Sequence, residues 1–128
     1  MPFAIADLPA LHGLLTLGYS LGGGRIAPLE DWKTALLADS DFDPALVFIV
    51  SDAQGVIAAV CQCWASAFIK DLVVHPCARR QGLGEALLRH TFIEFIARSA
   101  SVVDLKVEID NPTGARRLYE RVGMAEVT

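Results

Sequence analysis

A short basic loop with two glycines offers the clearest chemistry in this sequence. Arg79-Arg80-Gln81-Gly82-Leu83-Gly84 follows an apolar run, Phe68–Val74, and precedes residues 85–97, where apolar residues recur at helical spacing. The first N–H groups of a helix lack partners within the helix, and the helix dipole places partial positive charge there. Glycine lets an anion approach the backbone closely. The loop therefore predicts a site for a phosphorylated cofactor.

The spacing of this loop excludes two common kinds of phosphate site. A P-loop needs a Lys-Ser or Lys-Thr pair after its glycines, and none follows Gly84. A dinucleotide-binding fingerprint needs a third glycine, and the chain has none at the right place. What remains is Arg-x-x-Gly-x-Gly. A solvated surface pair is the alternative interpretation of Arg79 and Arg80, but glycines at a helix start favour phosphate contact.

The loop and two further blocks resemble the GNAT superfamily of N-acetyltransferases. Its signature is Gln/Arg-x-x-Gly-x-Gly/Ala. Leu72-Val-Val-His-Pro76 is similar to the family's strand that ends in Val-x-Pro before the loop. Asn111-Pro-Thr-Gly-Ala-Arg-Arg-Leu-Tyr-Glu-Arg-Val-Gly-Met124 is similar to its Asn-x3-Ala-x2-Leu-Tyr-x3-Gly-Phe/Met block. The specific resemblance covers about residues 68 to 124, and the first half of the chain matches only in pattern.

This resemblance implies a cofactor and a fold. Acetyl-coenzyme A would be the co-substrate, with its pyrophosphate in the loop. The fold would be α/β (α+β): a mixed, mostly antiparallel sheet, flanked by helices, with a splayed central pair of parallel strands. Residues 68–74 and 102–109 would form that pair, and the pantetheine arm would bind exposed backbone of the first strand. The implied cofactor-binding positions are Leu72, Val73, Val74, Arg79, Arg80, Gln81, Gly82, Leu83, Gly84, Asn111, Ala115 and Tyr119.

Acetyl transfer to an amine needs a neutral amine, a stabilised oxyanion and a proton for the departing thiolate. The resemblance implies that Tyr119 is the general acid at the thiolate; a tyrosine that only packs its helix on the sheet is the alternative. Asp71 lies where some members carry a carboxylate that deprotonates the amine through water; a solvated edge charge is the alternative. A backbone N–H near Val73 or Val74 is the expected oxyanion donor. Asn111 could cap a helix, contact the pantetheine, or do both.

Composition limits the class of protein. The 128 residues predict one domain, 1–128, and 53% hydrophobic with 20% charged residues is a globular composition. A net charge of −4 disfavours nucleic acid as the main partner. No apolar run approaches the roughly 18 residues of a membrane span, so we expect no membrane partner.

The cysteines favour a reducing compartment. Cys61, Cys63 and Cys77 make an odd set, without a secretory signal, and we expect a cytoplasmic protein. Cys61 and Cys63 would face the same side of a strand as small core residues. No further ligands occur at matched spacing, so we expect no metal site.

The hydrophobic pattern places the elements that position these residues. We expect helices over residues 7–17, 28–37 and 84–97, and a helix that Asn111 caps and Gly123 ends; the expected strands are residues 45–51, 56–64, 68–74 and 102–109. The helix after the loop would bury Leu88, Phe92, Phe95 and Ile96, and would form the pairs Glu85–Arg89 and Glu94–Arg98 on its wet side.

The chain departs from the family at its carboxyl end. The family has a strand there, then a loop and a final strand that inserts beside residues 102–109, and the sequence lacks residues for that final strand. We expect either that Ala125–Thr128 pairs beside residues 102–109 or that a second protomer covers the edge as a homodimer, because an open edge invites pairing.

Two functional hypotheses follow. The first is an N-acetyltransferase that moves an acetyl group from acetyl-coenzyme A to a primary amine by direct attack in a ternary complex. The second is a catalytically inactive GNAT-like module that binds coenzyme A as a sensor or assembly partner. Tyr119 favours the first hypothesis, and the missing final strand favours the second.

Overall fold

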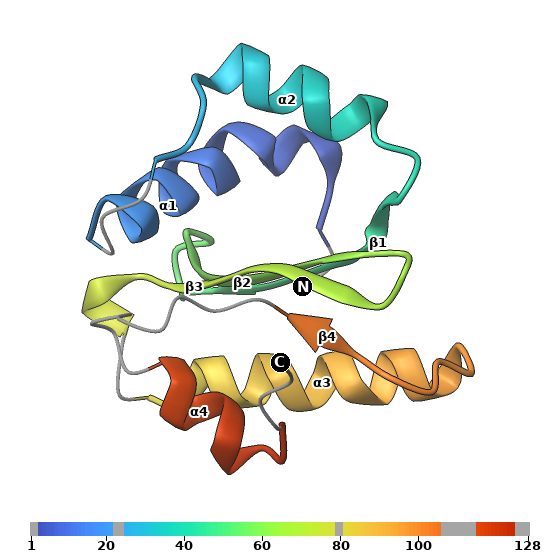
Figure 1. The fold of residues 1–128 in the computed structure, drawn as a ribbon. Helices are drawn as coiled ribbons and strands as arrows, with labels where there is room; N and C mark the ends of the chain where they lie inside the picture. The colour runs from blue at the N-terminus through green and yellow to red at the C-terminus, as the bar shows by residue number, and fades with distance from the viewer. Residues whose placement is uncertain (1–2, 22–24, 79–80, 106–114, 125–128) are drawn as a thin grey trace.

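A four-stranded sheet in the order β1-β2-β3-β4 forms the centre of the molecule (Figure 1). The computed structural model describes residues 3–21, 25–78, 81–105 and 115–124. β1 (Phe42–Ser51), β2 (Ile57–Trp64) and β3 (Phe68–Val74) are antiparallel neighbours, and β4 (Asp104–Leu105) pairs parallel with β3. The expected mixed, mostly antiparallel sheet is confirmed.

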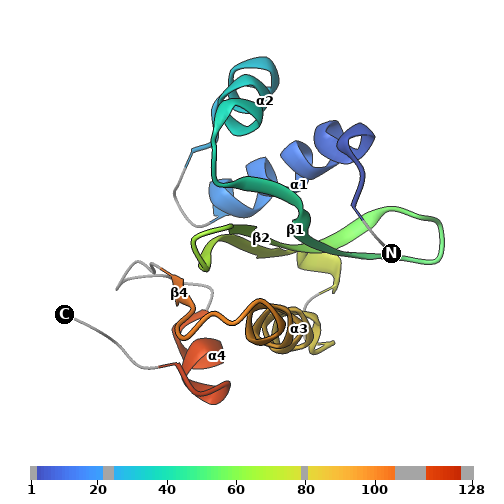
Figure 2. The same cartoon turned by 90° about the vertical axis from the view of Figure 1, so that its right-hand side faces the viewer.

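Helices cover both faces of this sheet (Figure 2). α1 (Leu8–Leu21) and α2 (Leu29–Ala38) lie on one face, and α3 (Leu83–Ala97) and α4 (Ala115–Arg121) lie on the other. Short 3-10 helices span Ile5–Asp7 and Pro76–Ala78. Along the chain, α1 and α2 come first and β1 to β3 follow. α3 and α4 then form the second helical layer, with β4 between them in sequence.

Two hydrophobic clusters, one on each face of the sheet, make the core. β2 contributes to both, because it is the central strand and is buried on both sides. The cluster beneath α1 and α2 contains Leu8, Leu11, Leu14, Leu15, Trp32, Leu36, Val47, Ile49, Ile57 and Val60. The cluster against α3 and α4 contains Leu46, Ala59, Cys61, Cys63, Ala67, Ile69, Leu87, Leu88 and Phe95.

The first helix is longer than the sequence predicted. α1 continues to Leu21, beyond the expected end at Leu17. The hydroxyls of Thr16 and Ser20 donate to helix carbonyls at 2.8 Å, so these residues bond within the helix rather than ending it. This extension brings the last turn of α1 over β3.

A bulge shifts the register of β3 by one residue. Gln62 pairs with Asp71, but the next residue, Cys63, pairs with Ile69, so Lys70 is the extra residue. Lys70 therefore leaves the regular alternation, and its ammonium lies 5.9 Å from the centre of the Trp64 ring, on the side of the sheet that α1 covers. Lys70 and Asp71, although consecutive, form an ion pair with each other.

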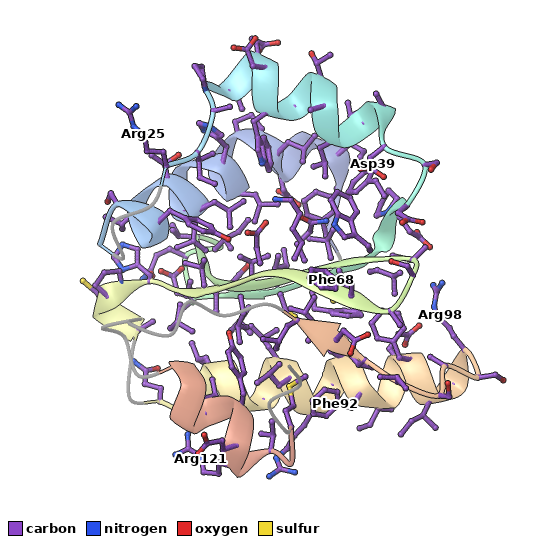
Figure 3. The ribbon with its side chains drawn as sticks, in the orientation of Figure 1. Arg25, Asp39, Phe68, Phe92, Arg98 and Arg121 are labelled. Atoms are coloured by element: carbon purple, nitrogen blue, oxygen red, sulfur yellow. The ribbon has the colours of Figure 1, made fainter. Side chains whose placement is uncertain are left out.

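The buried face of α3 differs from the expected one. Leu88 and Phe95 are buried and Phe92 is partly buried, but Ile96 is 72% exposed, so that prediction was wrong. The buried stripe instead adds Gly84, Leu87 and Thr91, and Ile96 lies about 100° around the helix from Phe95. The predicted pairs Glu85–Arg89 and Glu94–Arg98 both form, at 3.5 Å. Arg98, which is labelled in Figure 3, also lies 3.4 Å from Asp43.

The fourth strand begins two residues later than predicted. Residues 102 and 103 are not in a strand, and Val102 is 60% exposed. Residues 106–114 and Ala125–Thr128 lie outside the described residues, so the rest of this strand, the Asn111 cap, the final-strand arrangement and the homodimer stay predictions.

The corrected face of α3 predicts how two neighbouring substitutions differ. Phe95→Ala removes a side chain that is 1% exposed and should lower the free energy of unfolding by about 3–5 kcal/mol. Ile96→Ala should change it by less than about 0.5 kcal/mol, because Ile96 already lies in water. Urea denaturation of both variants measures the difference, and similar losses would show that the face is assigned wrongly.

Candidate functional site

Three elements meet at Gly84, in the first turn of α3. A Cβ atom added at Gly84 would lie 3.0 Å from Cδ2 of Leu118 in α4 and 3.8 Å from Cγ2 of Val74 at the end of β3. Gly84 is buried, so the contact leaves little room for any side chain. This glycine was predicted only as part of a phosphate loop, and the structure adds a packing role that the sequence did not reveal.

The start of α3 lacks a capping side chain. Gly82 precedes the helix with a left-handed backbone (φ +73°) and accepts the first helical hydrogen bond from the Ala86 N–H at 3.0 Å. Gln81 and Gly82 are exposed, and a Cβ at Gly82 would meet nothing within 4 Å. The first turn of α3 therefore keeps backbone donors that an anion could use. Arg79 and Arg80 lie outside the described residues.

An acidic side chain in this first turn is neutralised by two arginines. Glu85 lies 3.5 Å from Arg89 in α3 and 3.0 Å from Arg121 in α4. Arg121 is labelled on α4 in Figure 3. The pair with Arg121 ties α4 to α3, and the two cations offset a charge that would otherwise repel an anion.

Tyr119 comes from α4 and packs against the cluster that contains Cys61 and Leu88. Burial raises the pKa of the Tyr119 phenol to about 12. The phenol therefore stays protonated near neutral pH and remains a hydrogen-bond donor. Ala115 is the first residue of α4 that the structure describes, and Asn111 lies outside.

The end of β3 presents backbone at an edge with little pairing. The His75 N–H donates to the carbonyl of Ala58 in β2 at 2.8 Å. Because N–H groups alternate in direction along a strand, Val73 also points its N–H toward β2, whereas Val74 and Leu72 point theirs the other way. Among the described residues, β4 pairs with β3 only at Phe68 and Ile69. Of the two predicted oxyanion donors, Val74 has the orientation that can reach a ligand.

Asp71 lies on the opposite side of β3 from Leu72, as strand alternation predicted. Its side chain is fully buried, so the alternative of a solvated edge charge was wrong. The Tyr19 hydroxyl donates to Oδ1, and the Lys70 ammonium donates to Oδ2 at 3.0 Å. A buried carboxylate needs such partners, because an isolated charge is costly away from water.

Close packing of α1 on β3 makes the tyrosine contact possible. A Cβ atom at Gly18 would lie 2.5 Å from Cγ1 of Val73, so only glycine fits without a shift. Tyr19, the next residue, then reaches Asp71. Burial and the charge of Asp71 raise the pKa of the Tyr19 phenol, which keeps it protonated. The contacts of Tyr19 and Lys70 with Asp71 were not predicted from the sequence. Neither residue belongs to a motif, and the residue pattern does not reveal the bulge.

The cysteines lie where the sequence placed them. Cys61 and Cys63 are fully buried with their sulfur atoms 3.7 Å apart, and the Thr91 hydroxyl lies 3.4 Å from Cys61 Sγ. The hydrogen bond with Cys61, together with burial, raises the pKa of the Cys63 thiol. Cys77 is exposed, and its N–H donates to His75 Nδ1 at 3.0 Å.

The described residues contain neither a cluster of metal ligands nor a helix that could cross a membrane. In those parts of the chain, no group of three or more His, Cys, Asp or Glu side chains could hold a metal ion. Within the same residues, every helix is too short or too polar to cross a bilayer.

Comparison with known proteins identifies the family. The profile of the acetyltransferase (GNAT) domain matches residues 43–124, more than half of the chain. The chain belongs to the GNAT acetyltransferase family. A curated relative, the mycothiol acetyltransferase of Sanguibacter keddieii, is 29% identical over 98% of the chain, but the match covers only 39% of that protein.

Solved GNAT structures share the fold. A GCN5-related N-acetyltransferase from Sphaerobacter thermophilus superposes with a TM-score of 0.80 and 26% identity over 98% of this chain and 40% of that one. A ribosomal-protein alanine N-acetyltransferase from Escherichia coli gives 0.74 and 25% identity over 100% of this chain and 77% of that one. The chain thus spans about two fifths of the curated relative and of the Sphaerobacter protein.

The environments of the two tyrosines predict an unusual alkaline titration. The chain has only Tyr19 and Tyr119, and both phenol pKa values are raised. Absorbance at the tyrosinate band should therefore stay flat through pH 11 in the folded protein, whereas the urea-unfolded chain should titrate near pH 10. Since the folded pKa exceeds the unfolded one, this contribution to stability is complete below about pH 10 and declines toward about pH 12. A folded-state transition near pH 10 would contradict both assignments.

Proposed function

We propose that the chain is an N-acetyltransferase domain that uses acetyl-coenzyme A to acetylate a primary amine by direct attack in a ternary complex. The observation that carries this proposal is the convergence at Gly84, where the end of β3, the uncapped start of α3 and the Tyr119 helix meet. This convergence supports the proposal, because it brings together the end of β3, the start of α3 and the helix that carries Tyr119. We further propose that residues 1–128 act as one domain.

The cofactor would lie along this junction. The pyrophosphate binds the loop of Arg79, Arg80, Gln81, Gly82, Leu83 and Gly84, with the arginines and the first-turn N–H groups of α3 as donors. The pantetheine arm lies along the backbone of Leu72, Val73 and Val74, where Leu72 and Val74 turn their N–H groups away from β2. Asn111, Ala115 and Tyr119 complete the cofactor site from the α4 side. Three free cysteines favour the cytoplasm as the place of action.

The reaction needs no covalent enzyme intermediate. The amine nitrogen attacks the thioester carbon, a C–N bond forms, and the oxyanion of the tetrahedral intermediate accepts a hydrogen bond from the Val74 N–H. The C–S bond then breaks and coenzyme A leaves as a thiolate. Asp71 takes the proton of the amine through water, and Tyr19 and Lys70 hold its carboxylate in place.

Tyr119 serves the leaving thiolate mainly as a hydrogen-bond donor. Its pKa of about 12 lies above the roughly 8.5 of an ordinary thiol, so complete proton transfer is unfavourable by about three orders of magnitude. A hydrogen bond to a developing thiolate needs no such transfer. Position, rather than acidity, is therefore the contribution of this residue.

The named relatives support an amine acceptor of some kind. One is a ribosomal-protein alanine N-acetyltransferase and another is a mycothiol acetyltransferase, so the two relatives differ in their acceptors. Because the chain covers 39% of the second protein, its substrate does not transfer to this chain.

Cofactor binding can be tested with two glycines of similar backbone. Acetyl-coenzyme A at about 100 times its Kd should stabilise the protein by about 2.7 kcal/mol, a shift of several degrees in Tm. Gly82→Glu should abolish the shift through steric and charge conflict with the pyrophosphate. Gly55→Glu is the matched control: Gly55 also has a positive φ (+82°) and open space, but lies in the β1–β2 hairpin turn. An unchanged shift in Gly82→Glu would refute the position of the site.

The role of Tyr119 predicts a split between turnover and affinity. Tyr119→Phe keeps the buried ring but removes the hydroxyl, so kcat for amine-dependent thiol release should fall about 10–100-fold, the range expected for a hydrogen bond to a charged group. The Kd for acetyl-coenzyme A should stay within about twofold of the wild-type value, and the melt without ligand serves as the folding control. Wild-type turnover would remove the proposed role of this residue.

A further inference from the structure

A buried carboxamide on β2 has no hydrogen-bond partner. Gln62 is 0% exposed, and neither Oε1 nor Nε2 bonds to any group of the described residues. Nearly all buried polar groups in proteins are paired, because an unpaired one loses its hydrogen bonds to water without replacement. No neighbour in the described core explains why an amide, rather than a leucine or methionine, occupies this position. The unpaired amide indicates a polar partner that the described residues do not supply.

The sheet register places Gln62 beside Asp71. The two residues are direct partners across the antiparallel β2–β3 pair, so their side chains leave the same face of the sheet. The Cβ atoms of such a pair lie about 4.5–5.5 Å apart. Val60 and Val73, the next pair along this face, both pack in the cluster beneath α1. Gln62 and Asp71 thus form a polar pair next to the apolar pair of Val60 and Val73.

The polar pair connects with the surface through its neighbours. Tyr19 is partly exposed and donates to Asp71, and the Lys70 side chain is 34% exposed. Each carboxylate oxygen can accept two hydrogen bonds, so one bond from Tyr19 and one from Lys70 leave capacity for a ligand. These two partly exposed side chains lie next to the buried carboxylate and join it to the surface.

We propose that Gln62 binds the acceptor together with Asp71, and that this pair selects a primary amine with a hydroxyl or amide group on the carbon next to the amine-bearing one. The inference rests on the proposed transfer reaction. The carboxylate receives the amine proton through water, as in the proposed transfer. The carboxamide, which is both donor and acceptor, pairs with the neighbouring polar group. Amino alcohols, amino sugars and amino acid amides share this chemistry, whereas a plain alkylamine leaves Gln62 unpaired.

A matched pair of small amines tests the proposal. Ethanolamine and propylamine have the same length, but only ethanolamine carries the second polar group; glycinamide supplies the amide version. Gln62→Met keeps the length of the side chain and removes its hydrogen bonds. We expect the kcat/KM of the variant for ethanolamine and for glycinamide to fall about 10–100-fold, because an unmade buried hydrogen bond costs about that much. The value for propylamine should change less than about twofold.

A second buried substitution controls for repacking. Thr91→Val also removes a fully buried polar group, but on the other face of the sheet, and should leave the ethanolamine-to-propylamine ratio of kcat/KM unchanged. Gln62→Met should melt no lower than the wild type, because it removes an unpaired buried group. The proposal is overturned if Gln62→Met lowers kcat/KM equally for both amines, as expected if the amide only holds a structural water. It is also overturned if the kcat/KM of Gln62→Met stays at the wild-type value for both amines, since the ethanolamine-to-propylamine ratio is then unchanged.

A binding measurement separates this inference from the transfer reaction. If the wild type releases no thiol with any amine, the proposed function fails, and ligand-observed NMR with ethanolamine in the presence of coenzyme A decides the subsite alone. Weaker binding to Gln62→Met than to the wild type supports the subsite. No difference between the two proteins overturns it.

Discussion

The buried carboxylate of Asp71 constrains the packing on the face of the sheet that α1 covers. A charge removed from water must be balanced nearby, or the fold loses more than most single contacts supply. Two local irregularities provide the balance. The bulge in β3 turns Lys70 onto the same face, and Gly18 lets α1 approach Val73 closely enough for Tyr19 to reach the carboxylate. Both irregularities thus bring a balancing hydrogen-bond donor to the buried carboxylate.

β3 divides the candidate site into two halves. Asp71 and Val73 face α1, whereas Leu72 and Val74 face the layer of α3 and α4. The uncapped start of α3 and the phenol of Tyr119 belong to that second layer. A cofactor bound along the strand edge would therefore meet its acceptor from the opposite side of the sheet, with only the thickness of one strand between them. Such a division lets the acceptor side change without disturbing the cofactor side.

The sequence predicted the parts of this structure that depend on short patterns. β3 has the predicted bounds, because its residues form a distinct apolar and β-branched run. The helix after the loop begins within one residue of its predicted start, where two glycines interrupt the pattern. The face of α3 was wrong at Ile96, since which side of the stripe is covered depends on where α4 and the sheet lie. The cofactor positions came from a resemblance to a family. The match of that family's profile to residues 43–124 confirms the family, and the positions stay predictions. Tyr19, Lys70 and Gln62 could not be found, because their proximity depends on a bulge, a close helix approach and a strand register.

The order of elements has a consequence for how the chain folds. β1, β2 and β3 form a meander with short connections, so most of the sheet closes small loops and loses little chain entropy in doing so. The parallel contact of β3 with β4 differs, because the whole of α3 must be laid down between them. That crossover joins the most distant partners of the described sheet, so each of its residue pairs adds more to the contact order than a pair within the meander does. We therefore expect the meander, with α1 and α2, to form before the contact of β3 with β4.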